Sequence, residues 1–261
     1  MCGLDVTAIR ATGLGNMADA LVSVVIPVYN ERENIQTCIR RVETALKGLD
    51  HEILICYDFD ADTTLAAIAE MADKPASVRL VKNDLGRGAA YAIRAGFAAA
   101  RGDIVVTTMA DLSDPPEVIP AMVDKARSDG ADVVSGSRYM RGGSQKGGPR
   151  LKSFLSRTAG ISLHLLTGLA THDATNNFRA YSRRFLDSIT VESTHGFEVA
   201  LELTVKAHLK GFKVAEVPSS WTDRSAGTSR FRMWKWIPVY LRWYMLAVEG
   251  RAFPGRVRSR L

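Results

Sequence analysis

The sequence predicts an α/β protein with a mostly parallel central sheet flanked by helices. Apolar, β-branched runs alternate with helical patterns from Leu21 to Tyr139, which indicates parallel strands joined by crossover helices. The strands read as continuous apolar runs, as expected when helices cover both faces of a sheet. Polar, carboxylate-rich sequences follow several strands, at the edge where such sheets bind ligands.

The first elements follow in order. The apolar, β-branched run 21–29 predicts a buried strand, and the apolar stripe at helical spacing through 31–49 predicts a helix. The run 51–59 predicts a second strand. Aspartates and threonines begin the segment 60–72, and because these residues cap helices, we predict a helix there. The run 77–83 predicts a third strand.

The pattern then repeats. The alanine-rich segment 86–102 predicts a helix that ends at a glycine, and 103–109 predicts a fourth strand. Prolines in the first turn favour a helix over 115–130. The run 131–139 predicts a fifth strand.

Beyond the fifth strand the pattern changes. The Gly-rich, basic segment 140–152 predicts a loop, and 153–169 predicts a helix. We expect a polar turn leading into a helix over 172–186, a helix over 198–211 and a strand over 212–224.

Three parts of the chain are expected to differ in organisation. Residues 1–20 are expected to form a flexible N-terminal tail, residues 21–231 one α/β domain, and residues 232–261 a basic, aromatic-rich amphipathic segment. In that last segment, apolar and aromatic residues recur at helical spacing: Trp234, Ile237, Leu241, Tyr244, Met245 and Val248. Arg242 interrupts the apolar runs, so the segment is not expected to span a membrane. Its apolar face suits either an anionic membrane surface or packing on the domain or in a dimer.

Charge and cysteine content limit the partners. The net charge of +6 and the pI of about 9.3 favour an anionic partner, which leaves nucleic acid, a membrane surface or a phosphorylated substrate open. The three cysteines show no metal-ligand spacing, and an odd thiol suits a reducing compartment. We therefore expect a cytoplasmic protein.

Six sequence motifs occur in a characteristic order. They are VVIPVYNERENI, NDLGRGAAYAIRAGFAAARGD, MADLSDPP, GSRYMRGG, DATNNFRAY and EVPSSWTDRSAGTSRF. Over Leu21–Phe231 the chain resembles family 2 glycosyltransferases, especially those that make dolichol-phosphate or polyprenyl-phosphate sugars such as mannosyl lipids. The resemblance implies a GT-A (Rossmann-like) fold and inverting transfer of a sugar from a GDP- or UDP-linked donor. It also implies Mg²⁺ or Mn²⁺ as cofactor and a polyprenyl-phosphate acceptor at the cytoplasmic face of the membrane.

Residues at the strand ends match the donor-binding positions of the family. By this resemblance the nucleotide-sugar is bound by Pro27, Tyr29, Asn30, Glu31, Asp58, Lys82, Gly86, Arg87, Ala110 and Asp111. A carboxylate such as Glu31 accepts hydrogen bonds from a ribose diol, and glycines let backbone N–H groups approach a phosphate. The family usually has two aspartates where this chain has Tyr57 and Asp58, so the nucleobase stays open. The alternative is purely structural, with Asp60 or Asp62 capping the next helix.

The stretch TTMADLSDPP matches the metal-binding position of the family. There the pattern is usually Asp-Ala-Asp with an oxygen-bearing side chain two residues later, whereas this chain has Met109, Asp111 and Ser113. The resemblance makes Asp111, Ser113 and Asp114 the metal and diphosphate ligands. Met109 cannot serve, because Mg²⁺ and Mn²⁺ prefer oxygen ligands, so either Asp114 compensates or the metal binds weakly. The alternative is a helix N-terminus capped by aspartates.

A basic cluster follows the fifth strand. It comprises Arg138, Arg141, Lys146, Arg150, Lys152 and Arg157. By resemblance, Arg138, Lys152 and Ser156 bind the acceptor phosphate, and a loop with Arg224 and Ser229 closes over the diphosphate. The resemblance gives catalytic roles to Asp111, Arg138, Glu198 and Arg224, and Glu202 follows Glu198 by one helical turn. A phosphate acceptor is already ionised and needs no strong base. The alternative for the arginines is a solvated basic face.

Two other functions stay open from the sequence. One is transfer by the same fold to a hydroxyl acceptor in glycan or small-molecule synthesis, and the other is binding of nucleotides or nucleic acid without catalysis. We do not expect nucleic acid, because the carboxylates at the strand ends would repel its phosphates without a metal. A homodimer or a partner membrane protein is a further expectation.

Overall fold

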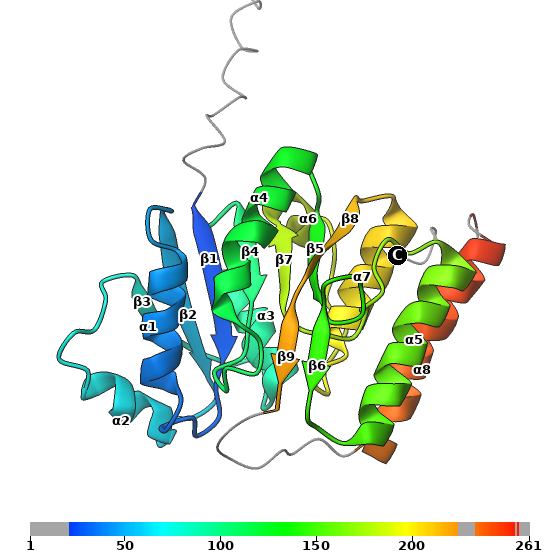
Figure 1. Ribbon diagram of the computed structural model, residues 1–261. Helices are drawn as coiled ribbons and strands as arrows, with labels where there is room; N and C mark the ends of the chain where they lie inside the picture. Colours follow the sequence, from blue (N-terminus) through cyan, green and yellow to red (C-terminus); the bar gives the residue numbers. More distant parts are fainter. Residues whose placement is uncertain (1–20, 224–232, 254, 256–261) are drawn as a thin grey trace, which may run out of the picture.

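The computed structural model describes residues 21–223, 233–253 and 255, without the side chains of Lys152 and of residues 233–236. A seven-stranded sheet runs through the molecule between two layers of helices (Figure 1). The strands are β1 (Val22–Pro27), β2 (His51–Tyr57), β3 (Val78–Lys82), β4 (Ile104–Thr107), β5 (Val133–Ser137), β7 (Arg179–Ser182) and β8 (Val214–Pro218). Their order is β3-β2-β1-β4-β7-β5-β8, and only β7 runs antiparallel to its neighbours. The predicted α/β class and the mostly parallel sheet are confirmed.

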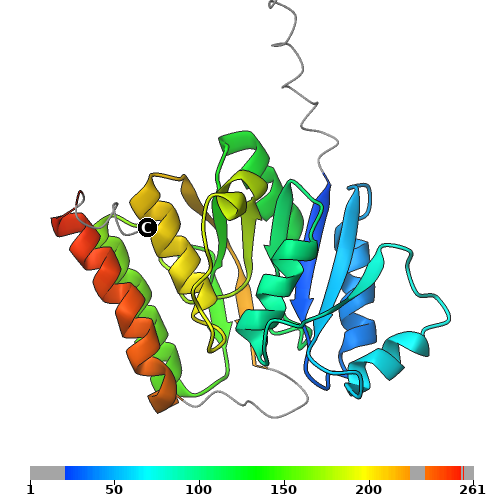
Figure 2. The same cartoon turned by 180° about the vertical axis from the view of Figure 1, so that it is seen from behind.

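Each face of the sheet has its own apolar core. One core is formed with α1 (Ile35–Ala45), α2 (Thr63–Ala69) and α4 (Ile119–Asp129), which follows the short 3-10 turn η2 (Pro116–Val118). The other is formed with α3 (Ala89–Ala99), α5 (Arg150–Thr167), α6 (Arg183–Asp187), α7 (Val199–Lys210) and α8 (Met233–Ala252), as seen from behind in Figure 2. Successive residues of a strand point to opposite faces, so Val24 contributes to the first core and Val25 to the second.

The expectation of a polar turn leading into a helix over 172–186 missed a strand that lies between the turn and the helix. The segment contains β7, which pairs antiparallel with β4 and β5 and fills the gap between them. The strand has four residues and begins with a buried arginine, Arg179. Neither its length nor its composition gives a strand pattern. Its helix, α6, follows at once, because the Ser182 hydroxyl caps it by accepting from the Phe185 N–H at 3.2 Å.

The loop expected over 140–152 and the single strand expected over 212–224 were also incomplete. Residues Ser144–Lys146 form β6, which pairs in parallel with β9 (Ser220–Thr222) in a separate two-stranded sheet. The chain therefore leaves the main sheet after β8. The small sheet is joined to the main site by a hydrogen bond of 2.9 Å from the Thr222 N–H to the Ser113 carbonyl.

The C-terminal segment forms the predicted helix, α8, which packs on α7. Trp243 and Ala247 are buried, each 1% exposed, and a side chain at Gly250 would meet Leu209 at 2.2 Å. A different side of the same helix exposes Leu241 and Met245, which are 52% and 55% exposed. Packing on the domain, one of the two expectations for this segment, thus accounts for one side of α8 and leaves the other side exposed. Within the described ranges, no helix has the length and apolar character to cross a bilayer.

Candidate active site

The strand ends predicted to bind the donor belong to β1, β2 and β3, which lie side by side in the sheet. Asn30 follows β1 with a left-handed φ of 55°, and its N–H donates to the Asp62 carboxylate at 3.0 Å. The same carboxylate accepts from the Thr64 N–H and caps α2. The prediction that Asp60 or Asp62 caps this helix is confirmed for Asp62, and the cap also fixes the end of β1.

Asp58, directly after β2, is held by two hydrogen bonds. Its Oδ1 accepts from Asn83 Nδ2 at 2.7 Å, and its Oδ2 accepts from the Gly88 N–H at 2.8 Å. Asp58 therefore anchors the Gly-rich loop before α3. Beside it, the rings of Tyr29 and Phe59 meet edge to face with centroids 5.5 Å apart.

Other predicted donor residues lie at the end of β3, in the loop after it and in the loop after β1. Gly86 has a φ of 152°, and a side chain there would meet the Tyr91 ring at 3.0 Å, so glycine permits the turn. Arg87 is exposed. Lys82 is also exposed and pairs with Asp60 at 2.7 Å, a hydrogen bond that raises the pKa of Lys82. Glu31 is half-buried and accepts from Asn34 Nδ2 at 2.9 Å.

A pocket of about 410 Å³ lies beyond the end of β4 and extends between α5 and α8. Its lining residues are Met109, Asp111, Ser113, Arg138, Leu155, Ser156, Ala159, Thr175, Asn176, Asn177, Phe197, Leu201, Trp221, Ile237, Tyr240, Leu241 and Tyr244. Polar groups are concentrated on the segments 109–113, 138 and 175–177, whereas α5 and α8 supply mainly apolar side chains. The pocket thus joins a polar end to an apolar wall.

Asp111 and Ser113 lie together at the polar end of this pocket. Asp111 is 8% exposed, and its Oδ1 accepts from the Ser113 N–H at 3.1 Å. Ala110 is buried at 1% exposure and faces the core. Among the described residues, no group of three or more His, Cys, Asp or Glu side chains converges on one point.

Asp114 lies behind the pocket wall. Its Oδ1 accepts from Asn176 Nδ2 at 2.9 Å, and its side chain does not line the pocket. Burial raises the pKa of Asp114 to about 7, although the Asn176 hydrogen bond acts in the opposite direction. A buried carboxyl that is partly protonated near neutral pH is poorly suited to replace the ligand missing at Met109.

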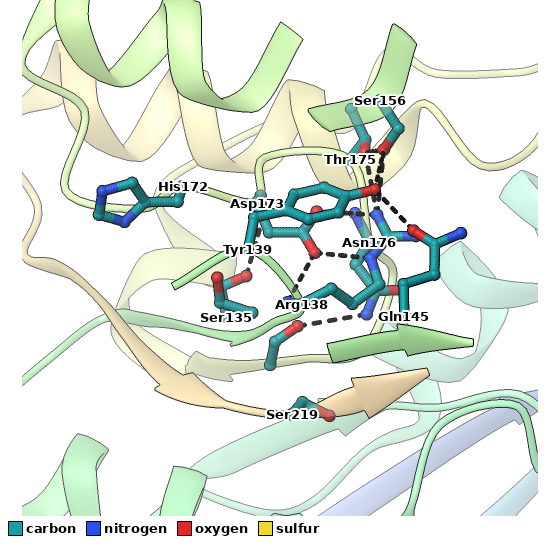
Figure 3. A network of polar contacts seen from close by, with 12 residues as sticks. Ser135, Arg138, Tyr139, Gln145, Ser156, His172, Asp173, Thr175, Asn176 and Ser219 are labelled. Atoms are coloured by element: carbon teal, nitrogen blue, oxygen red, sulfur yellow. Dashed lines mark hydrogen bonds and ion pairs between the residues drawn. The ribbon is translucent and has the colours of Figure 1, made fainter. Parts of the chain in front are cut away.

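Arg138 is the central cation of the pocket. Its side chain forms a bidentate ion pair with buried Asp173, from Nε to Oδ2 at 2.7 Å and from Nη2 to Oδ1 at 2.9 Å (Figure 3). The same Nη2 donates to Ser156 Oγ at 3.1 Å and to Thr175 Oγ1 at 3.3 Å, and these two hydroxyls are 2.6 Å apart. Burial alone would lower the pKa of Arg138, but the Asp173 carboxylate raises it. The guanidinium is therefore charged and fixed in orientation.

A second layer of hydrogen bonds supports this arrangement. The Tyr139 hydroxyl lies 2.9 Å from Gln145 Oε1 and 3.2 Å from Ser156 Oγ (Figure 3). Gln145 Nε2 in turn donates to Ser153 Oγ at 2.6 Å. Through these contacts β6 and the start of α5 are tied to the Arg138 site.

The remaining predicted site residues are either buried or lie outside the described part of the chain. Lys152 lies in the first turn of α5, and its side chain lies outside the described part, as do Arg224 and Ser229. Glu198 is fully buried beneath the pocket, and its Oε1 accepts from the His195 N–H at 2.8 Å. Its Oε2 is buried without a hydrogen-bond partner in the described ranges. Glu202 accepts from Lys206 Nζ at 2.7 Å and supports the fold.

Asp173, Thr175 and Asn176 are site residues that were not predicted from the sequence. All three belong to the DATNNFRAY motif, which was noted only for its order in the chain. Their contacts link residues far apart in sequence, so no local pattern marks them. The DATNNFRAY motif was the feature of the sequence from which these three residues could have been predicted.

Comparison with known proteins decides the family. The profile of Glycosyl transferase family 2 matches residues 23–190. The chain belongs to glycosyltransferase family 2. Its relatives include a dolichol-phosphate mannosyltransferase from Pyrococcus furiosus, 34% identical, and a polyprenol monophosphomannose synthase from Mycolicibacterium smegmatis, 36% identical. These matches cover 85% and 79% of this chain, and 62% and 79% of the relatives, so the first relative is considerably longer.

Other family members resemble the chain too. An undecaprenyl-phosphate 4-deoxy-4-formamido-L-arabinose transferase from Enterobacter is 35% identical over 80% of this chain and 62% of its own length. A structure of glucosyl-3-phosphoglycerate synthase from Mycobacterium tuberculosis with Mn²⁺ and uridine diphosphate has a TM-score of 0.64 at 21% identity. It covers 93% of this chain and 85% of its own. This likeness establishes the GT-A fold.

Proposed function

We propose that this family 2 glycosyltransferase transfers a sugar, with inversion, from a nucleotide-sugar to a polyprenyl phosphate. The observation that carries the proposal is the pocket, whose lining combines Asp111, Arg138 with the Ser156 and Thr175 hydroxyls, and apolar side chains of α5 and α8. A phosphate with an attached apolar chain matches this combination of polar and apolar groups. Relatives named as polyprenyl-phosphate sugar transferases support the same acceptor.

The donor belongs at the edge formed by β1, β2 and β3. Glu31 offers a carboxylate for a ribose diol, and the loop at Gly86–Gly88 precedes the N-terminus of α3, where backbone N–H groups favour phosphate. Because Asp58 is already engaged by Asn83 and Gly88, we propose that it shapes this loop. A GDP- or a UDP-linked sugar fits these features equally.

A divalent cation would be held by Asp111. The residues fit Mg²⁺ or Mn²⁺ as a weak protein site, since such ions often take one or two carboxylates and complete their shell with phosphate oxygens and water. Asp111 and Ser113 present oxygens in the pocket, whereas Asp114 is turned away. When bound, the ion would supply charge neutralisation for the leaving diphosphate.

We further propose that the protein works at the cytoplasmic surface of a membrane. The exposed large apolar side chains on α5 are Leu151, Phe154, Leu155, Leu165 and Leu166, and those on α8 are Ile237, Leu241 and Met245. We name this set the α5–α8 apolar face. The two helices lie side by side, with the Tyr244 hydroxyl donating to Ser162 Oγ at 2.9 Å (Figure 1). Exposed Arg150 and Arg157 flank the face and favour anionic lipid.

The test is transfer from a panel of GDP- and UDP-sugars with Mn²⁺ to a polyprenyl phosphate, compared with the matching polyprenol. We expect an organic-extractable, mild-acid-labile product from the phosphate alone. Transfer to polyprenol or to a soluble glycan would favour the hydroxyl-acceptor alternative. Nucleotide binding without transfer or hydrolysis of any donor would favour the non-catalytic one.

A further inference from the structure

Arg179 is a fully buried arginine directly behind the pocket. It is 0% exposed and lies at the start of β7. Its Nε donates to the Asn176 carbonyl at 2.7 Å, and Nη2 donates to the Asp173 carbonyl. Its Nη1 is buried without a hydrogen-bond partner in the described part of the chain. The acceptors of this guanidinium are therefore backbone carbonyls and not carboxylates.

Stability alone explains such a residue poorly. Burying a charged group costs free energy unless it is well paired, and apolar residues of similar volume often stabilise a core at least as well. Surrounding strand residues such as Val134 and Ala180 are apolar and show that the core accepts such side chains here. The particular contacts of Arg179 therefore indicate a role in holding the segment 173–177.

That segment supplies much of the polar part of the pocket. Asp173 pairs with Arg138, Thr175 bonds to Ser156 and Arg138, and Asn176 bonds to Asp114. Arg179 binds the carbonyls of Asp173 and Asn176, near the two ends of the segment. With these carbonyls turned toward β7, the side chains between them are fixed against the pocket.

Arg179 acts on the pocket through Asp173. The Asp173 carboxylate is fully buried and binds Arg138 Nε and Nη2. Arg179 holds the backbone carbonyl of the same residue. Burial lowers the pKa of Arg179, but a guanidinium stays protonated in proteins. Its N–H groups are therefore charged donors to the two carbonyls.

We infer that Arg179 is a positioning residue for an anionic acceptor: it fixes the 173–177 segment, and Asp173 in that segment orients the charged Arg138 guanidinium in the pocket. The inference rests on the proposed function and deepens it. It assigns the pocket to a phosphate monoester on an apolar chain and not to a neutral alcohol, because a fixed guanidinium beside the Ser156 and Thr175 hydroxyls favours an anion.

The experiment measures binding by the full chain with calorimetry, using geranyl phosphate and geraniol as probes. Arg179→Met removes both the charge and the carbonyl contacts, and Arg179→Lys keeps the charge but loses the planar fork. We expect Arg179→Met to weaken geranyl phosphate binding by about tenfold with geraniol unchanged, because Arg138 then loses the fixed orientation in which it binds an anion. Arg179→Lys should give an affinity between those of the wild type and Arg179→Met.

Arg183 provides the matched control. It also donates to backbone carbonyls, those of Ala100 and Gly102, but at the opposite end of β7. Arg183→Met should lower the unfolding temperature and leave both probe affinities unchanged. Geranyl phosphate affinities within about twofold of wild type in both Arg179 variants, a difference under 0.5 kcal/mol, would show a structural role only and overturn the inference.

Two further outcomes can be distinguished from failure of the inference: misfolding of Arg179→Met, and failure of the proposed phosphate acceptor. If Arg179→Met does not fold, Arg179→Lys decides, because wild-type affinity for geranyl phosphate in that variant would exclude the positioning role. If the wild type binds geranyl phosphate no better than geraniol, the proposed phosphate acceptor itself fails, whatever the variants show.

Discussion

Asp111 is the carboxylate on which the proposed transfer depends, since it is the acidic side chain that lines the pocket. We expect Asp111→Ala to lower transfer by about tenfold or more, because the charge that would hold a divalent cation is lost. The unfolding temperature should stay close to that of the wild type. Steady-state transfer with Mn²⁺ measures the effect.

Two comparisons make this prediction specific. Asp73→Ala removes an exposed carboxylate that pairs with Arg40 and should leave transfer unchanged. Asp114→Ala should reduce transfer less than Asp111→Ala, because Asp114 lies behind the pocket wall. Near-normal transfer by Asp111→Ala would place the diphosphate end of the site elsewhere.

Asp114 should make stability depend on pH. Burial raises its pKa from 3.8 to about 7 in the folded chain, so the folded state binds an extra proton between these values. Its contribution is then fully present below about pH 4 and is lost as pH rises through 7, with a slope of up to ~1.4 kcal/mol per pH unit. Urea unfolding of the wild type and of Asp114→Asn over this range measures it.

The Asn variant is the control for this titration. It keeps an oxygen that accepts from Asn176 but cannot ionise, so the fall in the free energy of unfolding between about pH 4 and 7 should be smaller than in the wild type. Parallel pH profiles for the two proteins would mean that Asp114 titrates at its ordinary value.

At the scale of elements, α8 is attached to the domain by Trp243. The indole is 1% exposed and lies beneath Arg242 and Lys206, whose charged groups are 4.6 and 5.2 Å from the ring. We expect Trp243→Ala to cost about 3–5 kcal/mol in the free energy of unfolding and to expose α8 to trypsin. Met245→Ala, on the exposed side of the same helix, should cost little. Equal effects of the two substitutions would contradict the packing described.

Periodic elements were predictable from the sequence because their apolar spacing carries their type. The strands β1, β2 and β4 were found in this way, and so was α8. β7 was not, because a four-residue strand with Arg179 in its core has no apolar period and gains its pairing only from β4 and β5. The pair β6–β9 was missed for the same reason, as each partner is too short to be recognised alone.

The site, too, was predictable only where a local sequence motif marks its residues. Motif matches indicated Asp111, Ser113, Arg138 and Ser156 as site residues, and the structure brings these four to one pocket. The contact between Arg138 and Asp173 depends on how two distant segments meet, so the sequence alone could not show it.

At the scale of the whole molecule, the α5–α8 apolar face predicts binding to anionic membranes. We expect the full chain to sediment with phosphatidylglycerol vesicles at low salt. Replacing Leu165, Leu166, Leu241 and Met245 by serine should reduce the bound fraction about tenfold or more, since each buried apolar side chain contributes about 1–3 kcal/mol. Deleting 233–261 should also weaken binding.

A control variant is available at the opposite edge of the sheet. Leu80 and Leu85 are 44% and 53% exposed near β3, and their replacement by serine should leave vesicle binding unchanged. If the wild-type protein stays in the supernatant, the α5–α8 apolar face is a contact for another protein, and the lipid must be reached through it.

The position of α8 along the chain has a consequence for biosynthesis. β1, β2 and β3 are complete by Lys82, yet Ile237 and Tyr240 on α8 form part of the pocket wall. Domains generally fold as units, N-terminal ones first, as a chain leaves the ribosome, so a nascent chain can complete the sheet and the strand ends proposed to bind the nucleotide before α8 adds the last wall of the pocket. Ribosome-bound chains stalled before Met233 should therefore bind a nucleotide-sugar but leave polyprenyl phosphate unglycosylated, which delays the first turnover until translation has passed α8.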